Sequence, residues 1–415
     1  MTDNRERLAW AIVLISFALC LTSAISLPLG VRAYLRNART GLDILLEPQQ
    51  GTPRMQPRGS GQVIALIGPT WDVSASTVIT TDNVSEGLLT LYAPGPEPAA
   101  VAWIKLYRNT EALLIAARSP RFALSPLPHQ VILEVRPPSA ANGESDTEGR
   151  VRISVAPAGG RDTVAELHTP HLTAVLREGS YEVRVRAAFS ELSVREGNAQ
   201  VQSLGGSAIT LESSQRTIAY NSTAPLEALP GERNLLRNGS FSQPLGEGWE
   251  VYSQGVQQGL AGTVTETSVA GRPAARFYRQ GIGHAEVGIV QRIHYDVRDF
   301  TSLVLHLSVQ VRGQSLPGCG SLGSECPIIV RLDYEDIYGT DRQWYYGFYS
   351  VEHVPPDLIQ PWEELVPTGT WVTFDSGNLI EDLEAPPAVI QSVTIYASGH
   401  SFEALVTEVE LLAQE

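Results

Sequence analysis

The sequence is poor in cysteine, methionine and lysine, and it lacks the common catalytic motifs. Its 415 residues include 3 cysteines and 2 methionines, and Lys105 is the single lysine among 30 basic residues. Three cysteines are too few for a disulfide-dense scaffold. The net charge of −15 disfavours tracking the phosphates of nucleic acid. No nucleophile-elbow, P-loop, Rossmann or zinc motif occurs. We therefore expect no nucleic-acid partner and no enzyme, and no cofactor beyond the ion considered below.

The first thirty residues contain a long apolar run. Leu8–Val31 carries no charged residue, and as a helix it would extend about 36 Å, enough to cross a hydrocarbon core of about 30 Å. The apolar core of a signal peptide is normally shorter, about 7–15 residues. We expect a retained membrane-spanning helix at 8–31, preceded by a short cytoplasmic tail at 1–7.

Charges and cysteines give opposing indications of topology. Two arginines precede the apolar run and three follow it: Arg5, Arg7, Arg32, Arg36 and Arg39. This count favours a cytoplasmic body, although long domains translocate largely regardless of such charges. Cys319 and Cys326 lie in a glycine-rich stretch and are expected to form a disulfide, which persists in oxidising compartments. Two free thiols or half a metal site are the alternatives. We expect a single-pass protein of the cell membrane with its body outside the cytoplasm.

The rest of the chain has the pattern of an all-β protein. Residues 32–61 are polar and contain prolines, which predicts a stalk, or a short amphipathic lead-in at Leu42, Ile44, Leu45 and Leu46 followed by a linker. Beyond them, short alternating runs such as Leu88–Tyr92 recur between turn residues at a spacing of roughly ten residues. A second proline-bearing linker is expected at 223–233. The predicted fold is mainly β, with one transmembrane helix and two all-β domains at 62–222 and 234–415.

Three consecutive segments of the first domain resemble the FecR-type extracytoplasmic domain. They are Thr169–Val185 (TPHLTAVLREGSYEVRV), Leu192–Val201 (LSVREGNAQV) and Ile209–Arg216 (ITLESSQR). The family shows a strand led by Thr-Pro, a Glu-Gly hairpin and a closing turn. The glycine usual in that turn is missing here. Well-known members transmit an envelope signal to a sigma factor through a cytoplasmic segment. Since only seven residues precede the span, this role is the second alternative.

The last third of the chain resembles a galactose-binding-like jelly roll, the fold of many carbohydrate-binding modules. The resemblance is carried by Asn234–Trp249 (NLLRNGSFSQPLGEGW) and by Phe402–Leu412 (FEALVTEVELL). These segments match the opening strands and the terminal strand of that fold. The resemblance implies a β-sandwich that binds glycan or cell-wall polymer without catalysis.

An aromatic cluster is the candidate sugar site, because aromatic faces stack on sugars and nearby polar groups bond hydroxyls. Strand alternation places Tyr345 on the opposite face from its two neighbours, so one of the two sets must pack inside. Ordinary core packing of the cluster is the alternative. The candidate platform is Trp344, Tyr346, Trp362 and Trp371, with Asp341, Arg342 and Gln343 as its polar flank.

A structural calcium ion is implied by the jelly-roll resemblance. Its candidate ligands are Glu408 and Glu410 on the last strand, and Ser240 and Ser242 stand where acids are common in the family. Calcium takes six to eight oxygen ligands. A pair of solvated strand carboxylates is the alternative.

We therefore expect a membrane-anchored, extracytoplasmic, non-catalytic binding or scaffold protein of the bacterial cell envelope. Its expected ligands are glycan, cell-wall polymer or protein partners. The first alternative is an accessory structural subunit of a membrane or surface assembly. Sugar binding predicts an exposed aromatic strip, whereas assembly predicts a large apolar patch.

Overall fold

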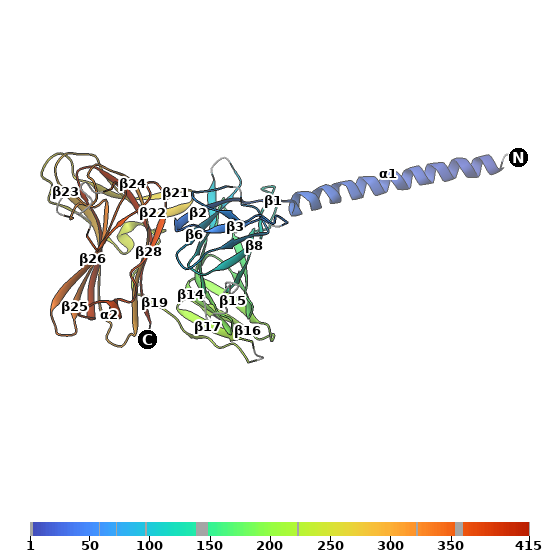
Figure 1. The fold of residues 1–415 in the computed structure, drawn as a ribbon. Helices are drawn as coiled ribbons and strands as arrows, with labels where there is room; N and C mark the ends of the chain where they lie inside the picture. Colours follow the sequence, from blue (N-terminus) through green and yellow to red (C-terminus); the bar gives the residue numbers. More distant parts are fainter. Residues whose placement is uncertain are drawn as a thin grey trace.

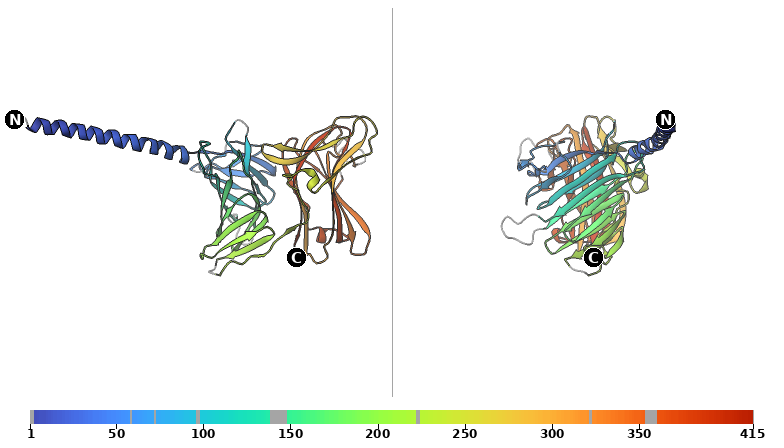
Figure 2. Two further views of the ribbon diagram at one scale, coloured as in Figure 1. Left: turned by 180° about the vertical axis from the view of Figure 1, so that it is seen from behind. Right: turned by 90° about the vertical axis from the view of Figure 1, so that its right-hand side faces the viewer.

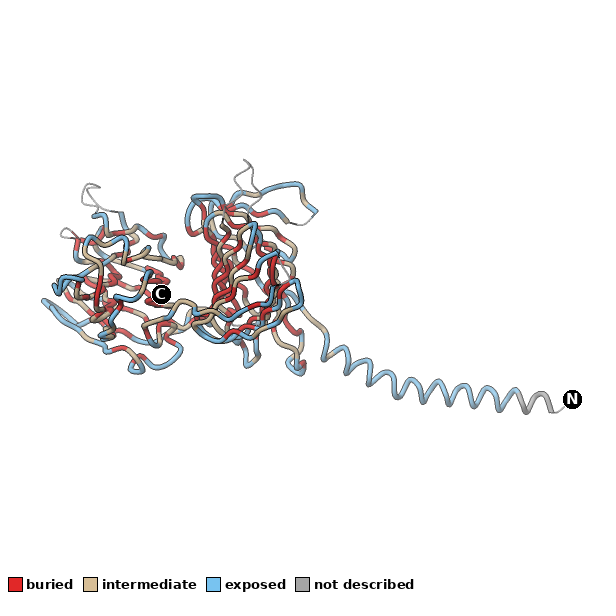
Figure 3. Tube along the Cα trace, turned by 90° about the horizontal axis from the view of Figure 1, so that it is seen from below, coloured by how far each residue is buried: buried red, intermediate tan, exposed pale blue. Residues whose placement is uncertain are grey.

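A computed structural model describes residues 3–57, 59–71, 73–95, 98–137, 148–221, 224–320, 323–352 and 360–414. One long helix carries two β-sandwiches, which confirms the mainly β fold (Figure 1). Figure 3 shows the buried segments inside the two sandwiches, while the helix is exposed along its described side chains except at the half-buried Leu35.

The helix α1 (Asp3–Asn37) begins inside the predicted tail and ends six residues after Val31. Its segment Leu8–Asn37 is long and apolar enough to cross a membrane, and its most apolar stretch is not buried against the body. The same length and composition fit a signal sequence near an N-terminus. The predicted apolar helix is thus confirmed, and membrane anchoring is taken up under Proposed function.

The N-terminal sandwich consists of two sheets. The first sheet has ten strands in the order β16-β15-β12-β11-β9-β8-β5-β3-β4, with β1 beside β8. Its strands are β1 (Arg39–Gly41), β3 (Arg54–Gln56), β4 (Ile64–Ala65), β5 (Thr77–Thr80), β8 (Glu111–Pro120), β9 (His129–Arg136), β11 (Thr163–His168), β12 (Leu172–Leu176), β15 (Asn198–Ser203) and β16 (Ala208–Glu212). All of its pairs are antiparallel except β9 with β11.

The second sheet has eight strands in the order β18-β17-β14-β13-β10-β7-β6-β2. They are β2 (Asp43–Gln50), β6 (Glu86–Ala93), β7 (Ala99–Leu106), β10 (Gly149–Val155), β13 (Gly179–Val185), β14 (Phe189–Glu196), β17 (Gln215–Tyr220) and β18 (Leu229–Pro230). Alternate residues of both sheets point between them and form one apolar core, in which Leu46, Leu91 and Tyr181 are fully buried.

The C-terminal sandwich also consists of two sheets, each of six strands. The third sheet contains β19 (Arg233–Asn234), β21 (Thr263–Val269), β22 (Arg272–Arg279), β24 (Ser302–Gln314), β28 (Val372–Asp375) and β30 (Phe402–Gln414). The fourth sheet contains β20 (Glu250–Gln254), β23 (Ala285–Asp296), β25 (Ile328–Asp336), β26 (Asp341–Tyr349), β27 (Glu363–Leu365) and β29 (Pro387–Gly399). The short helices η1 (Leu245–Glu247) and α2 (Leu379–Asp382) lie in connections. Phe277 and Phe348 are among the fully buried residues of this second core.

The stalk predicted at 32–61 is wrong, because residues 32–37 belong to the helix and residues 39–56 supply three strands of the N-terminal sandwich. The strand β2 pairs with β6, and Leu42, Ile44 and Leu46 point into the core. The linker predicted at 223–233 is also partly strand, since β18 pairs with β17 and β19 pairs with β30. The prolines gave both segments the composition of linkers, although short alternating runs are present. Proline does not exclude a strand here, because edge strands tolerate it.

The four sheets lie side by side as one stack, with the helix leaving from the side of the first sheet (Figure 1). The right-hand view of Figure 2 shows the strands of the N-terminal sandwich broadside, with the helix projecting from one margin. The second and third sheets meet in the middle of the stack, where the backbone N–H of Ala100 donates to the carbonyl of Ala270 at 2.7 Å. This meeting surface is called the seam below.

Candidate functional site at the seam

The seam is made by the outward faces of two sheets, which in a single sandwich would face water. In β10, Val151 and Ile153 fill the first core, and Arg152 between them points toward the third sheet. The same alternation places Glu182 and Arg195 on the seam side of β13 and β14. The seam is therefore lined by charged residues that are buried only because the two sandwiches meet.

Buried ion pairs cross the seam. Arg152 Nη2 donates to Glu410 Oε1 at 2.7 Å, and Arg195 Nη1 donates to Glu410 Oε2 at 3.2 Å. The side chains of these two arginines are only 3% and 2% exposed. Glu410 on β30 thus holds two cations of the other sandwich, and its loss would leave both partly unpaired.

Glu182 forms a second centre on the N-terminal side of the seam. It accepts hydrogen bonds from Arg150 at 2.9 Å, from Arg184 at 2.8 Å and from Arg195 at 2.5 Å. Burial opposes its ionisation, but these three guanidinium groups hold the pKa of Glu182 well below its ordinary value. Since Arg195 contacts both Glu182 and Glu410, the two centres form one network.

An arginine between two tryptophans forms the apolar part of the seam. The guanidinium of Arg272 lies 4.6 Å from the ring centre of Trp371 and 5.6 Å from that of Trp103. Its Nη2 also donates to Glu408 Oε2 at 2.7 Å. Burial would raise the pKa of Glu408, but Arg272 and Arg152 lower it to about 2. The cation–π contacts and the ion pair together fix Arg272 between the sandwiches.

A β-bulge in β30 aims the two glutamates at the seam. Leu307 of β24 is opposed by two residues, Glu408 and Val409, and Glu408 has a positive φ of 52°. Before the bulge Leu405 faces the seam, and after it Glu410 does, although their positions in the sequence differ by five, an odd number. In an unbroken strand an odd separation would put these two side chains on opposite faces.

The opening Asn-Gly of the C-terminal domain packs against this bulge. The N–H of Val409 donates to the carbonyl of Gly239 at 3.0 Å, and a Cβ on Gly239 would lie 1.8 Å from the Val409 carbonyl oxygen. Only glycine fits at so close an approach. The motif that carries the jelly-roll resemblance therefore supports the strand that supplies the seam glutamates.

A pair formed by a buried histidine and an aspartate also lies at the seam. His306 Nδ1 lies 2.6 Å from Asp375 Oδ1, and the His306 side chain is fully buried. Burial, together with the charge of Arg152, lowers the pKa of His306. The pKa of Asp375 is also held well below its ordinary value by His306 and Arg150, against the effect of burial.

A cleft of about 750 Å³ opens beside the network and is lined by both sandwiches. Arg152, Arg195 and Arg272 line it together with Glu408, Glu410 and Ser242. Among the described residues, the Nε atoms of these three arginines have no hydrogen-bond partner. The cleft thus combines a volume typical of ligand sites with buried N–H donors that remain unpaired.

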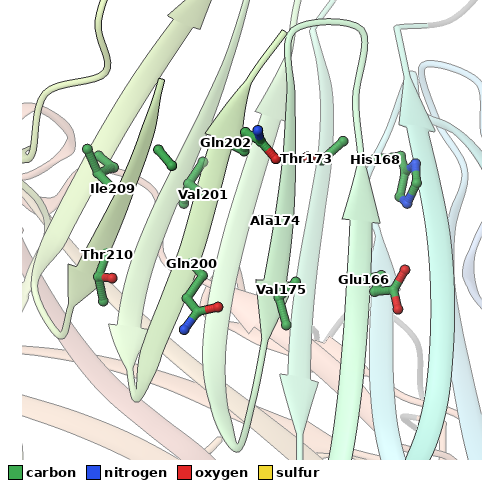
Figure 4. A pocket seen from close by; sticks show the side chains of 11 residues that line it. Glu166, His168, Thr173, Ala174, Val175, Gln200, Val201, Gln202, Ile209 and Thr210 are labelled. Carbon is green, nitrogen blue, oxygen red and sulfur yellow. The ribbon is translucent and has the colours of Figure 1, made fainter. Parts of the chain in front are cut away.

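A second hollow, of about 540 Å³, lies on the outer face of the first sheet (Figure 4). Carboxylate, imidazole, amide and hydroxyl groups line it. Its polar residues are Glu166 and His168 on β11, Thr173 on β12, Gln200 and Gln202 on β15, and Thr210 on β16. Such groups suit hydroxyl-bearing ligands, but the residues lining this hollow include no phenylalanine, tyrosine or tryptophan.

The predicted aromatic platform is distributed over three places. Trp344 stacks on Tyr346 at 6.3 Å, and Tyr346 stacks in turn on Phe374 beside the second core. Trp362 packs edge-on against Tyr345 at 4.9 Å, on the other face of the strand, as alternation predicts. The fourth member, Trp371, is the seam residue described above and is 8% exposed. The four rings therefore do not share one surface.

The polar flank forms hydrogen bonds within the fourth sheet. Three bonds account for it: Gln391 Nε2 donates to Asp341 Oδ1 at 2.6 Å, Arg342 Nε donates to Asp336 Oδ2 at 3.0 Å, and Gln343 Nε2 donates to Asp333 Oδ1 at 2.8 Å.

The candidate calcium ligands both have arginine partners. Glu408 pairs with Arg272, and Glu410 pairs with Arg152 and Arg195. In the described part of the chain, no group of three or more histidine, cysteine or acidic residues is placed to hold a metal ion. Calcium at these carboxylates stays a prediction, and it would have to compete with guanidinium groups already in contact.

The expected disulfide between Cys319 and Cys326 is present. Both cysteines are fully buried, in a small cluster with Ile329 and Tyr349. Gly347 packs closely against this disulfide. A Cβ on Gly347 would lie 2.6 Å from the sulfur of Cys326, which accounts for glycine at this position.

Sequence reasoning missed the seam arginines and Trp103. One usable signal was present: Arg150, Arg152 and Ser154 alternate with the apolar residues of β10. That pattern, however, is also the pattern of an ordinary solvated strand face. Their burial depends on a second sandwich, which no local pattern reveals.

No protein-family model and no curated protein matches the chain. A putative anti-sigma factor from Parabacteroides distasonis is similar over 37% of this chain and 59% of its own length, at 15% identity and a TM-score of 0.24. A family 11 carbohydrate-binding module from a cellulase of Clostridium thermocellum is similar over 44% of this chain and 95% of its own length, at 18% identity and a TM-score of 0.26. The module TmCBM61, solved with β-1,4-galactotriose, is similar over 44% of this chain and 99% of its own length, at 13% identity and a TM-score of 0.25. Likenesses of this size carry no argument about function.

Proposed function

We propose that this chain is a membrane-anchored, non-catalytic binding scaffold of the cell envelope, with its body outside the cytoplasm. The observation that carries the proposal is the seam, which joins two sandwiches into one body at the end of an exposed apolar helix. The buried Cys319–Cys326 disulfide supports an oxidising compartment for that body.

A buried ionic seam suits a scaffold better than a flexible pair of modules. Interfaces between domains of one chain are commonly polar and permit relative motion. Here, opening the seam would expose Arg152 and Arg195 and separate both from Glu410 of the other sandwich, while Arg195 would keep Glu182 at 2.5 Å. With neighbouring sheets about 10 Å apart, the stack holds its outer sheet about 30 Å from the sheet nearest the helix.

The cleft at the seam is the binding site we propose. Its volume of about 750 Å³ lies within the usual range for ligand sites. Paired arginines and glutamates, with Ser240 and Ser242 at its edge, favour a ligand that carries both hydroxyl and carboxylate groups. An acidic glycan or cell-wall polymer has that chemistry.

The second candidate function is an accessory subunit of a membrane assembly. The hollow on the outer face of the first sheet favours it, because this face lies on the side of the body from which the helix leaves (Figures 1 and 4). A partner embedded in the same membrane would meet that face first.

Two measurements on the full-length chain in mild detergent test these functions. The first is purification from the native membrane with mass spectrometry of the complex; stoichiometric partners would favour the accessory subunit. The second is a glycan array of neutral and acidic polymers. We expect Ser242→Trp, which fills the mouth of the cleft, to abolish binding, and Trp344→Ala to leave it unchanged. Loss with Trp344→Ala alone would return the site to the aromatic strand. A lone chain that binds no polymer would contradict the proposed function.

A further inference from the structure

The end of the helix places one part of the body at the membrane surface. The apolar run Leu8–Val31 accounts for about 36 Å of helix, and Arg32–Asn37 adds about 9 Å. A headgroup layer is about 5–8 Å deep. The helix leaves from the side of the first sheet (Figure 2), so the segments at its base lie nearest the lipid.

The loop Arg121–Pro128, which joins β8 to β9, is attached to this base. Ser125 Oγ donates to the carbonyl of Arg36 at 2.6 Å. The ring of Phe122 meets the ring of Tyr34 edge-on at 5.7 Å. The loop therefore keeps a fixed position beside the last turn of the helix.

A half-buried arginine holds the loop through hydrogen bonds to its backbone. Arg161, from the turn between β10 and β11, donates through Nη1 to the carbonyls of Ser125 at 2.5 Å and Leu127 at 2.7 Å. Despite this support, the side chain of Leu124 at the tip remains 78% exposed. A leucine displayed on a braced loop suits insertion into an interface, since no ordering cost remains to be met.

The surroundings of the loop are basic, although the whole chain has a net charge of −15. Arg36 and Arg121 are exposed on either side of the contact between helix and loop. A pocket of about 430 Å³ beside the loop is lined by Arg161 and Arg177, with Asp162 as its single acidic residue. Two guanidinium groups against one carboxylate favour a phosphate ligand.

We propose that this region is a membrane seat that binds anionic lipid headgroups. In the seat, Leu124 enters the interfacial layer, Arg36 and Arg121 contact lipid phosphates, and the pocket at Arg177 takes a further phosphate. The proposal rests on the membrane anchoring proposed above and adds a fixed orientation of the body. It also gives Arg36, one of the arginines that follow the apolar run, a role other than setting topology.

The test uses the full-length chain with Cys20→Ser, so that an introduced cysteine is the only free thiol. Leu124→Cys carries an environment-sensitive fluorophore in vesicles of phosphatidylcholine with or without the anionic lipid phosphatidylglycerol. Quenchers attached to the lipid report contact with the bilayer. Leu260→Cys, in the C-terminal sandwich and 79% exposed, is the matched control.

We expect a blue-shifted, strongly quenched label at position 124 in the anionic vesicles, less quenching in neutral vesicles or at high salt, and none at position 260. Arg36→Gln and Arg121→Gln should each lower, about fivefold, the ratio of chains whose loop contacts the bilayer to chains whose loop does not. Extraction with alkaline carbonate tests the anchor separately. If the chain stays in the vesicles but the labels at positions 124 and 260 are quenched equally, the membrane seat is refuted and the anchoring stands. Equal quenching in both lipids would overturn the phosphate contacts. Release by carbonate would instead overturn the anchoring.

Discussion

Replacing Glu410 by glutamine isolates the contribution of the seam to the stability of the protein. The carboxylate contacts Arg152 at 2.7 Å and Arg195 at 3.2 Å, and these arginines are 3% and 2% exposed. Removing one partner of a buried ion pair costs about 3–5 kcal/mol, because the remaining charge keeps its desolvation penalty. We expect a loss of that size, since a neutral amide cannot balance two guanidinium groups.

The matched control is Glu250→Gln, whose partner Arg292 lies on a neighbouring strand of the fourth sheet. Both side chains of this pair are 63% exposed. Exposed ion pairs contribute about 0–1 kcal/mol, so the control should unfold almost as the original chain does.

Urea titration in detergent, followed by tryptophan emission, measures both variants. At an m-value of about 3 kcal/mol/M, the loss lowers the midpoint by about 1–1.7 M. Trp103 and Trp371 lie in the seam, so their exposure should precede that of the buried cores. Equal midpoints for the Glu410 and Glu250 variants would refute the structural role given to the seam.

Three further predictions concern acid, the disulfide and the cation–π contact. Arg272 and Arg152 overcome the effect of burial and lower the pKa of Glu408 to about 2, so the stabilisation by Glu408 is complete above pH 4.5 and disappears as the pH falls toward 2. An acid titration followed by tryptophan emission should show the seam opening between these pH values. Opening confined to higher pH would contradict this. Replacing Cys319 and Cys326 by serine opens a loop with a sequence separation of 7 and should cost about 2.5 kcal/mol in a urea titration, whereas identical midpoints would exclude a stabilising bond. Arg272→Gln should lower the free energy of unfolding by at least about 3 kcal/mol and red-shift the emission of Trp103 and Trp371; unchanged emission would argue against the position of Arg272 between the two indole rings.

The parts of the fold that depend on local pattern were predictable from the sequence. The uncharged run Leu8–Val31 indicated a long apolar helix, and one is present. Alternating residues indicated strands throughout the body, and the glycine-rich spacing of Cys319 and Cys326 indicated their bond. Each of these features rests on interactions between residues close in sequence.

The stalk and the aromatic platform show where local pattern fails. In the first, Leu42 and Leu46 alternate as in any strand, but the prolines nearby gave the segment the composition of a linker. In the second, Trp344 and Trp371 are of the same type and near in sequence, yet Trp344 lies on β26 of the fourth sheet and Trp371 directly precedes β28 of the third. Which aromatic residues share a surface depends on sheet topology, which the sequence does not display.

The seam was less predictable still, because it depends on a departure from regular alternation. Counting in twos from Leu405 would place Glu410 in the core of the C-terminal sandwich. The bulge at Glu408 moves it to the other face, where Arg152 and Arg195 lie. A positive φ at a glutamate is uncommon, and no residue preference announces it.

The bulge also determines which face of β30 each of the following residues takes. The five-residue step from Leu405 to Glu410 keeps apolar residues inward on both sides of an odd interval. Losing the bulge at the same chain length would send Glu410 toward the core and Leu411 toward the arginines. Deleting one residue within the step would instead remove the bulge and leave an even step, in which Glu410 still faces the arginines. When related chains are compared, a step of five residues with a bulge and a step of four without one therefore predict the same seam.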